Sequence, residues 1–160
     1  MAVIRQFRAI RPTPEMAEKV AALPYDVVNS EEAREMTKNN PYSFLHVDKA
    51  EIDLSRETDI YSPEVYNKAK ENLQGMIKDG ILVQDDKPML YVYELTMDER
   101  SQTGIAACAS IDEYINSTIK KHELTREDKE QDRIRHVDIC NANTGPIFLA
   151  YRTEEEISKI

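Results

Sequence analysis

The sequence predicts a single α+β domain, in which a mixed or antiparallel sheet is interspersed with helices. Two patterns carry this prediction. Apolar residues recur at helical spacing after Ser62-Pro63, and two strand-like runs flank a hairpin loop at residues 98–101. The chain has 160 residues and is 41% hydrophobic, which is enough for one core and is typical of globular proteins.

The first third of the chain alternates strands with short helices. Residues 3–10 alternate in side-chain character as a strand does, and prolines end the run. Ser30 and the two glutamates after it are typical of a helix start, and the following helix should stop before Pro41. The expected elements are a strand at 3–10, helices at 15–23 and 30–38, a strand at 43–47 and a surface loop at 51–61.

The rest of the chain contains the clearest helix. Ser62 is its expected cap, Pro63 suits its first helical position, and Gly80 should end it. We then expect strands at 81–83, 89–95 and 103–111, a charged helix at 125–137 and a strand at 147–151. An acidic helix start at Thr153 is followed by few residues, so residues 1–160 are expected to be the N-terminal portion of a longer protein.

The acidic balance of the chain limits its partners. The net charge is −9 and the pI is near 4.9, so the overall field repels nucleic acids and anionic membranes. No apolar run approaches the roughly 18 residues that span a bilayer, and arginines interrupt the apolar N-terminus. With only two cysteines, we expect a cytoplasmic protein with no membrane contact, for which nucleic acid is a disfavoured partner.

Metal binding is not expected. Cys108, His122, His136 and Cys140 are the candidate ligands, but they form no CxxC knuckle, and Cys108 lies in an apolar strand where a small core residue is expected. We predict no metal site and no disulfide. His46 lies in the predicted strand at 43–47 and is expected to be a hydrogen-bonded core residue rather than a ligand.

The sharpest functional signal is a cationic stripe on the charged helix. The stripe consists of basic residues at offsets of 4, 3, 4 and 3, which fall within roughly a quarter of the helix circumference. Its members are His122, Arg126, Lys129, Arg133 and His136. Phosphate and carboxylate groups bind to clustered guanidinium and ammonium donors, so an anion site is one interpretation. The other is a solvated helix whose ion pairs contribute only about 0.2–0.5 kcal/mol each.

The anion interpretation assigns roles to particular residues. Arg126, Lys129, Arg133 and His136 would bind the anion, with Asn143 and Thr144 supplying a short backbone nest. Glu123 and His122 are the candidate catalytic residues, because an acidic shoulder beside the cations could act as a base or hold a hard cation. The four glycines form no phosphate-binding loop, so a nucleotide would bind by another route.

Several long motifs resemble one family over the whole chain. They are PYDVV (24–28), NPYSFLHV (40–47), EIDL (51–54), GILVQDDKPMLYVY (80–93), KKHELTREDKEQDR (120–133) and ANTGPIFLAY (142–151). In this order they resemble the N-terminal part of the uncharacterised family called domain of unknown function 1015. The later part of that family carries an Asp-Gly-His-His-Arg-like motif, and this sequence lacks it. The motif is similar to one in ParB-like proteins, including free-serine kinases.

Two functions follow as expectations. The first is an enzyme acting on small phosphorylated or carboxylated metabolites, such as a serine-kinase-like phosphotransferase, for which the cofactor would be a nucleotide with Mg²⁺. The alternative is a non-catalytic domain whose basic helix face binds a small anionic ligand or an acidic partner. An enzyme should place His122, Glu123, Arg126 and Arg133 around a concave pocket, whereas an interaction domain should expose them on a flat surface.

Overall fold

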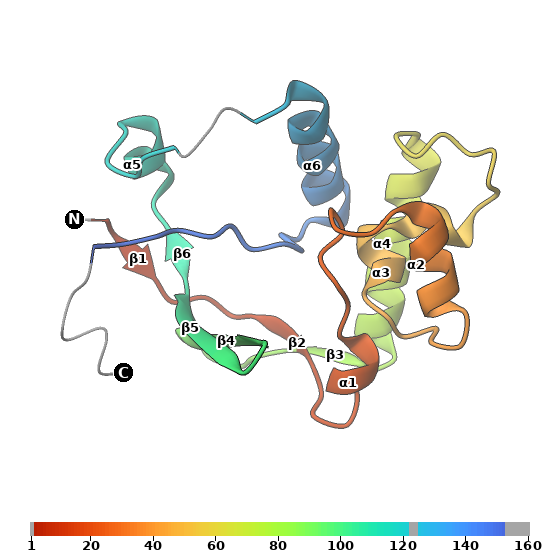
Figure 1. Ribbon diagram of the computed structural model, residues 1–160, viewed down its shortest axis with the longest axis horizontal. Coiled ribbons are helices and arrows are strands. Elements are labelled where there is room, and N and C mark those ends of the chain that lie inside the picture. The colour runs from red at the N-terminus through yellow and green to blue at the C-terminus, as the bar shows by residue number, and fades with distance from the viewer. Residues whose placement is uncertain (1, 122–124, 153–160) are drawn as a thin grey trace.

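A computed structural model describes residues 2–121 and 125–152. Helices gather at one end of the molecule and short strands at the other, and residues 141–152 run back from the helices toward the strands (Figure 1). The helical end contains α1 (Ala17–Val20), α2 (Ser30–Thr37), α3 (Leu45–Asp48), the 3₁₀ helix η1 (Ala50–Asp53), α4 (Pro63–Lys78) and α6 (Glu127–Cys140). A short α5 (Ile111–Ile115) lies beside the strands.

The helix α4 is the centre of the core. Its apolar face, including Val65, Ala69, Leu73 and Met76, is buried and packs with residues of α1, α3, β3 and α6. Pro63 occupies its first turn, and Gly80 follows it at a φ of 70°, a left-handed conformation that glycine adopts without strain. These features confirm the helix predicted between Ser62 and Gly80. Ser62 occupies the N-cap position, but its hydroxyl forms no capping hydrogen bond.

The strands form three separate antiparallel pairs. They are β1 (Ile4–Arg5) with β6 (Cys108–Ala109), β2 (Ile10–Pro12) with β3 (Leu82–Gln84), and β4 (Tyr91–Met97) with β5 (Arg100–Ala106). Asp98 and Glu99 join β4 to β5 with φ values of 49° and 62°, as in a type I′ hairpin turn. The helices and antiparallel strands confirm the α+β fold class.

Two expected elements in the first half are wrong. Residues 43–47 are not a strand: Leu45 begins α3, and Leu45 and Val47 are both buried between neighbouring helices. A five-residue run is too short for the spacing of its apolar residues to distinguish a strand from a helix. Its conformation is instead set by burial of its side chains among the neighbouring helices. The expected surface loop at 51–61 begins as η1, in which Glu51 and Ile52 are buried.

The expected strands near the two ends are also shorter or absent. The run at 3–10 is divided into β1 and β2, and the run at 103–111 stops at β6 because Ile111 begins α5. Residues 147–151 form no strand, and Cys108 is exposed rather than in a core. A strand needs a hydrogen-bonded neighbour, and the described chain provides none for residues 147–151.

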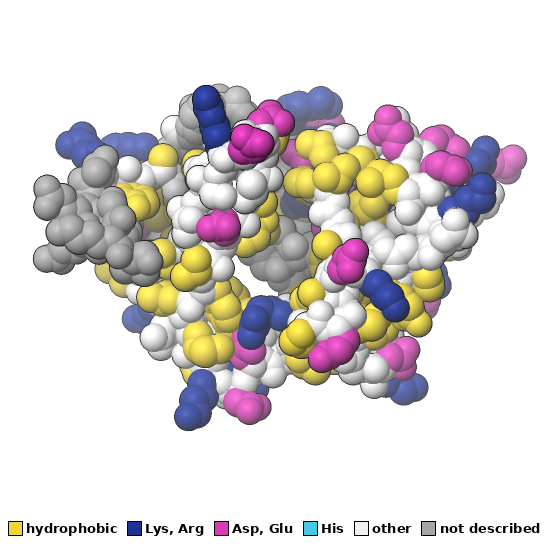
Figure 2. Space-filling model, turned by 60° about the horizontal axis from the view of Figure 1, so that its bottom comes forward, with side chains coloured by type: hydrophobic (Ala, Val, Ile, Leu, Met, Phe, Trp, Pro, Cys, Tyr) yellow, Lys and Arg dark blue, Asp and Glu magenta, His cyan; other side chains and the backbone are white. Residues whose placement is uncertain are grey.

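The buried residues are concentrated in the helical end. They lie between Val20 and Leu82 and at His136 and Cys140, and no described residue from 83 to 135 is buried. On the face drawn in Figure 2, hydrophobic side chains accordingly reach the surface in several patches. None of the described helices has the length and apolar character required to cross a membrane.

Candidate functional site

A cationic pocket lies beside the C-terminal end of α2. The pocket is an open depression of about 580 Å³, a size suited to a small metabolite. Its lining contains three permanently charged cations and a histidine but no carboxylate. The lining residues are Arg34, Thr37, Lys38, Asn39, Pro41, His46, Ile52 and Arg56.

The helix α2 carries Arg34 and Lys38 to the pocket, and its start is fixed by a capping box. The Asn29 side chain accepts hydrogen bonds from the backbone N–H groups of Glu31 and Glu32. The Glu32 carboxylate in turn accepts the Asn29 backbone N–H at 2.8 Å. The cap is therefore Asn29 rather than the expected Ser30, whose hydroxyl donates instead to the buried Glu51 carboxylate at 2.7 Å.

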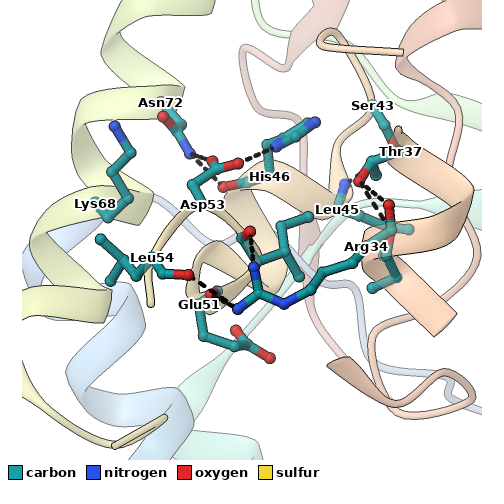
Figure 3. Close-up of polar contacts among 12 residues, drawn as sticks. Arg34, Thr37, Ser43, Leu45, His46, Glu51, Asp53, Leu54, Lys68 and Asn72 are labelled. Carbon is teal, nitrogen blue, oxygen red and sulfur yellow. Dashed lines mark hydrogen bonds and ion pairs between the residues drawn. The ribbon is translucent and has the colours of Figure 1, made fainter. Parts of the chain in front are cut away.

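Arg34 connects α2 to the opposite wall of the pocket. Its guanidinium donates to the backbone carbonyl oxygens of Glu51, Ile52 and Leu54 (Figure 3). Those carbonyls belong to residues of η1 and to its C-cap Leu54, and the Glu51 oxygen also accepts the backbone N–H of Leu54. The guanidinium thus fixes η1 against α2, and its positive charge stays at the edge of the pocket.

His46 is fixed between two hydrogen-bond acceptors. Its Nδ1 lies 2.8 Å from Asp53 Oδ1, and its Nε2 lies 3.2 Å from the backbone oxygen of Asn40. Asn72 on α4 donates to the other oxygen of Asp53, so the three side chains form a row (Figure 3). Only the imidazolium donates from both nitrogens, and the hydrogen bond to Asp53 raises the pKa of His46 despite its partial burial. His46 therefore lines the pocket as an imidazolium that is paired with the Asp53 carboxylate.

Lys38 and Arg56 are the two exposed cations of the pocket. Lys38 pairs with Glu35 at 3.6 Å and Arg56 with Glu31 at 2.9 Å, and both basic side chains are mostly exposed. Exposed pairs of this kind contribute little to stability, so a bound anion can compete for these cations at small cost. Arg34 and His46 supply fixed charge, and Lys38 and Arg56 supply donors that can close on a ligand.

The predicted charged helix is present, and the exposed cations at its N-terminal end, Arg126 and Lys129, contact other side chains of the protein. It runs from Glu127 to Cys140 and begins and ends two to three residues later than the expected 125–137. Arg126 forms a two-point pair with Asp128, at 2.7 and 3.1 Å. Lys129 lies against Tyr61, with its Nζ 3.3 Å from the hydroxyl oxygen.

Three other predicted residues gather around an internal carboxylate. Thr144 donates to Asp48 Oδ1 at 2.8 Å, and the charges of Arg133 and His136 act on the same carboxyl group. Burial raises the pKa of Asp48, whereas Thr144, His136 and Arg133 act to lower it. The structure thus brings Thr144 into contact with Asp48 and places Arg133 and His136 near enough for their charges to lower the pKa of its carboxyl group.

Arg133 and His136 also contribute to the packing of α6 against its neighbours. The Arg133 guanidinium lies 4.2 Å from the centre of the Tyr25 ring and donates to Asp132. His136 is 3% exposed, and its Nε2 donates to the Val47 carbonyl at 3.0 Å. Asn143 is exposed, while His122 and Glu123 lie outside the described residues. Binding of an external anion at the predicted residues stays a prediction.

Sequence reasoning missed the pocket because its residues are not periodic. Arg34, Lys38, His46 and Arg56 come from two helices and a loop, and only the fold places them together. The sequence signal at the pocket is His46, which lies within the NPYSFLHV motif at residues 40–47. The expected hydrogen bonding of His46 is confirmed, but the residue lies half-buried on α3 rather than in a strand.

The comparison with known proteins identifies the family. The model of the family described as "Protein of unknown function (DUF1015)" matches residues 4–160. The chain belongs to this family. The description of DUF1015 assigns no activity, and no curated protein or solved structure shows significant similarity to the chain. Any function for this DUF1015 chain therefore has to be argued from its residues and their geometry.

Proposed function

We propose that this chain binds a small phosphorylated or carboxylated metabolite in the cationic pocket. The observation that carries the proposal is the charge of the lining. Arg34, Lys38, His46 and Arg56 line one depression without a carboxylate, on a chain whose net charge is −9. Each of these cations has a carboxylate neighbour outside the lining, and the exposed pairs of Lys38 and Arg56 are weak enough for a bound anion to replace them.

The fixed parts of the pocket favour a compact anion. Arg34 and His46 are held by neighbouring backbone and carboxylate groups, so their charges do not need to be ordered when a ligand binds. Lys38 and Arg56 can each donate charge-assisted hydrogen bonds to a phosphate or carboxylate oxygen. A phosphomonoester or a dicarboxylate presents enough oxygens for both.

We further propose that the bound metabolite is a substrate and that the protein is a serine-kinase-like phosphotransferase. A phosphoryl group would pass from a Mg²⁺-bound nucleotide to the serine hydroxyl oxygen, which loses its proton, giving O-phosphoserine and the shortened nucleotide. This part rests on the resemblance in the sequence. His122 and Glu123 are its proposed catalytic residues, and the cations of α6 are proposed to bind the nucleotide.

A non-catalytic binding domain is the second candidate, and the state of His46 favours it. A general base needs an unprotonated nitrogen directed at its substrate. Both nitrogens of His46 are instead directed at acceptors, so within the pocket this residue binds charge rather than removes a proton.

Calorimetry tests the binding proposal. We expect O-phosphoserine and succinate to bind at low ionic strength and pH 6.5, and uncharged glycerol not to bind. Lys38→Gln and Arg56→Gln should each weaken binding about tenfold, the scale of one charge-assisted hydrogen bond. Lys78→Gln is the matched control, because Lys78 is also an exposed lysine at the end of a helix. Equal affinity of the Lys38 and Lys78 variants would contradict the proposal.

Phosphorus NMR separates the enzyme from the binding domain. A phosphotransferase should convert a mixture of serine, nucleotide and Mg²⁺ to O-phosphoserine, with a matching loss of nucleotide phosphate. A binding domain should bind O-phosphoserine and leave the mixture unchanged.

A further inference from the structure

The strand-bearing end of the molecule has no core of its own. Every residue of β4 and most of β5 are exposed or only half-buried, and no described residue from 83 to 135 is buried. A large apolar surface on a folded protein is typical of an interaction site. The apolar residues in this region are therefore candidates for a contact between molecules.

The β4–β5 hairpin offers both an apolar face and unpaired edges. Tyr93, Leu95 and Met97 point to the same side of β4, since alternate residues share a face, and Met97 is 76% exposed. The β5 residues on this same side are Gly104, Gln102 and Arg100, so its apolar character comes from β4. The opposite face carries the Val92–Ile105 pair and polar pairs such as Thr96 with Ser101 at 2.7 Å. Because the sheet has two strands, each strand also has an edge without a described backbone partner.

The segment 147–151, with sequence IFLAY, is the complementary feature. It is extended and almost wholly apolar, and Phe148 is 79% exposed. In the described chain its backbone N–H and C=O groups have no backbone partner, so they are available for the hydrogen bonds of an added strand. Among the described residues, those that precede the segment anchor it to the helical end: Thr144 donates to Asp48, and Ala142 packs on the core.

We propose that the segment 147–151 of one copy of this chain pairs with an edge of the β4–β5 hairpin of a second copy. The added strand would place Ile147, Leu149 and Tyr151 on the same side as Tyr93, Leu95 and Met97. The exchange is reciprocal, so each copy gives one strand and receives one, as in a two-fold symmetric dimer. This proposal is independent of ligand binding in the cationic pocket.

The size and charge of the surface suit a second copy as the partner. Each large apolar side chain can bury on the order of 100 Å², so the six side chains on the shared face amount to roughly 600 Å² per copy when the two enlarged sheets pack face to face. A standard interface buries about 800 Å² per partner. Two chains of net charge −9 repel each other, but segment 147–151 carries no charge and β4 carries only Glu94. The strands that would meet therefore add little like charge to the interface, although the hairpin turn carries Asp98 and Glu99.

Sedimentation equilibrium of the 160-residue chain tests the proposal. We expect a dimer of twice 18.4 kDa at micromolar concentration. Leu149→Pro removes a backbone donor from the added strand, and Leu95→Lys places a charge on the apolar face, so each should weaken dimerisation at least tenfold. Val27→Glu is the control: Val27 is equally apolar and 61% exposed but lies at the helical end, so the dimer should persist.

Circular dichroism should show that all three variants keep the helix content of the wild type, because each changed side chain is exposed. Hydrogen exchange then reports on the strand itself, since amides of β4 or β5 should lose protection in Leu149→Pro. A monomeric wild type, open-ended aggregates, or a dimer that Leu149→Pro leaves intact would each overturn the proposal.

Discussion

His46 Nδ1 and Asp53 Oδ1 lie 2.8 Å apart, which joins α3 to the last residue of η1. Asn72 donates to the second oxygen of Asp53 and so connects the pair to α4. The wall of the cationic pocket is thereby fixed to the central helix of the core. The charge state of this one pair should accordingly affect both stability and ligand binding.

The pair predicts a particular pH dependence of stability. The hydrogen bond to Asp53 raises the pKa of His46, so the stabilisation is complete below the unfolded value of about 6.5 and is lost as pH rises through the folded pKa. Burial alone would raise the pKa of Asp53, but its interactions with His46 and Asn72 lower that pKa. The contribution of the Asp53 carboxylate to stability is therefore lost only at acid pH.

Urea unfolding of the wild type and His46→Gln should therefore differ most between about pH 4.5 and 6.5, by about 1–2 kcal/mol. The difference should shrink above that window. Asp53→Asn should reproduce the same profile, and a difference that stays constant up to pH 9 would show that the imidazolium is not involved.

Asp132 should be the most sensitive carboxylate on α6. It accepts a hydrogen bond from the buried Tyr66 hydroxyl at 2.9 Å and another from Arg133. Burial and the bond to Asp132 raise the pKa of Tyr66 to about 12, so the hydroxyl remains a donor throughout the neutral range. Asp132→Ala leaves this buried hydroxyl without an acceptor and should cost about 1–3 kcal/mol of unfolding free energy.

Asp128→Ala is the control on the same helix. The ion pair between Asp128 and Arg126 is exposed, so this substitution should change the free energy of unfolding by no more than about 0.5 kcal/mol. If chemical denaturation shows similar losses of stability for the Asp132 and Asp128 variants, the predicted importance of the Tyr66–Asp132 hydrogen bond is contradicted.

Thr144 should act through its hydroxyl on Asp48. Thr144→Val keeps the shape of the side chain but removes the only side-chain donor described for that carboxylate, and should lower stability by about 1–2 kcal/mol. Thr144→Ser retains the hydroxyl and should remain near the wild type. Thermal denaturation of the two variants at neutral pH distinguishes this role from simple packing.

Asn29 should be needed for the pocket because it fixes the start of α2. Asn29→Ala removes the side-chain half of the capping box and should cost about 1 kcal/mol. Asn29→Ser should recover most of this loss, since serine is also a good cap. Chemical denaturation of the two variants measures the difference.

The elements that were predictable from sequence carry their own local signals. The helix α4 has a proline start, a glycine end and a helical apolar period, and the hairpin has the turn residues Asp98 and Glu99. The short helix α3 has none of these signals, and its conformation follows from burial of Leu45 and Val47 between other helices. Residues 147–151 have a strand sequence but lack a strand partner in the described chain.

The candidate site residues also fall into those that were predictable from sequence and those that were not. The cations of α6 were visible because they recur on one helix, but their partners Asp48, Tyr25 and Tyr61 come from distant segments. The pocket cations Arg34, Lys38 and Arg56 have no common period. Only the packing of η1 against α2, through Arg34, places them on one surface.

The most direct test of the pocket is an NMR titration of ¹⁵N-labelled protein with O-phosphoserine at pH 6.5 and low salt. Saturable shifts should centre on the amides around Arg34, Lys38, His46 and Arg56, and should be lost in the Lys38→Gln/Arg56→Gln double variant. Shifts centred instead on α6 and Thr144, or no saturable shifts at all, would contradict the assignment of the anion site to this pocket.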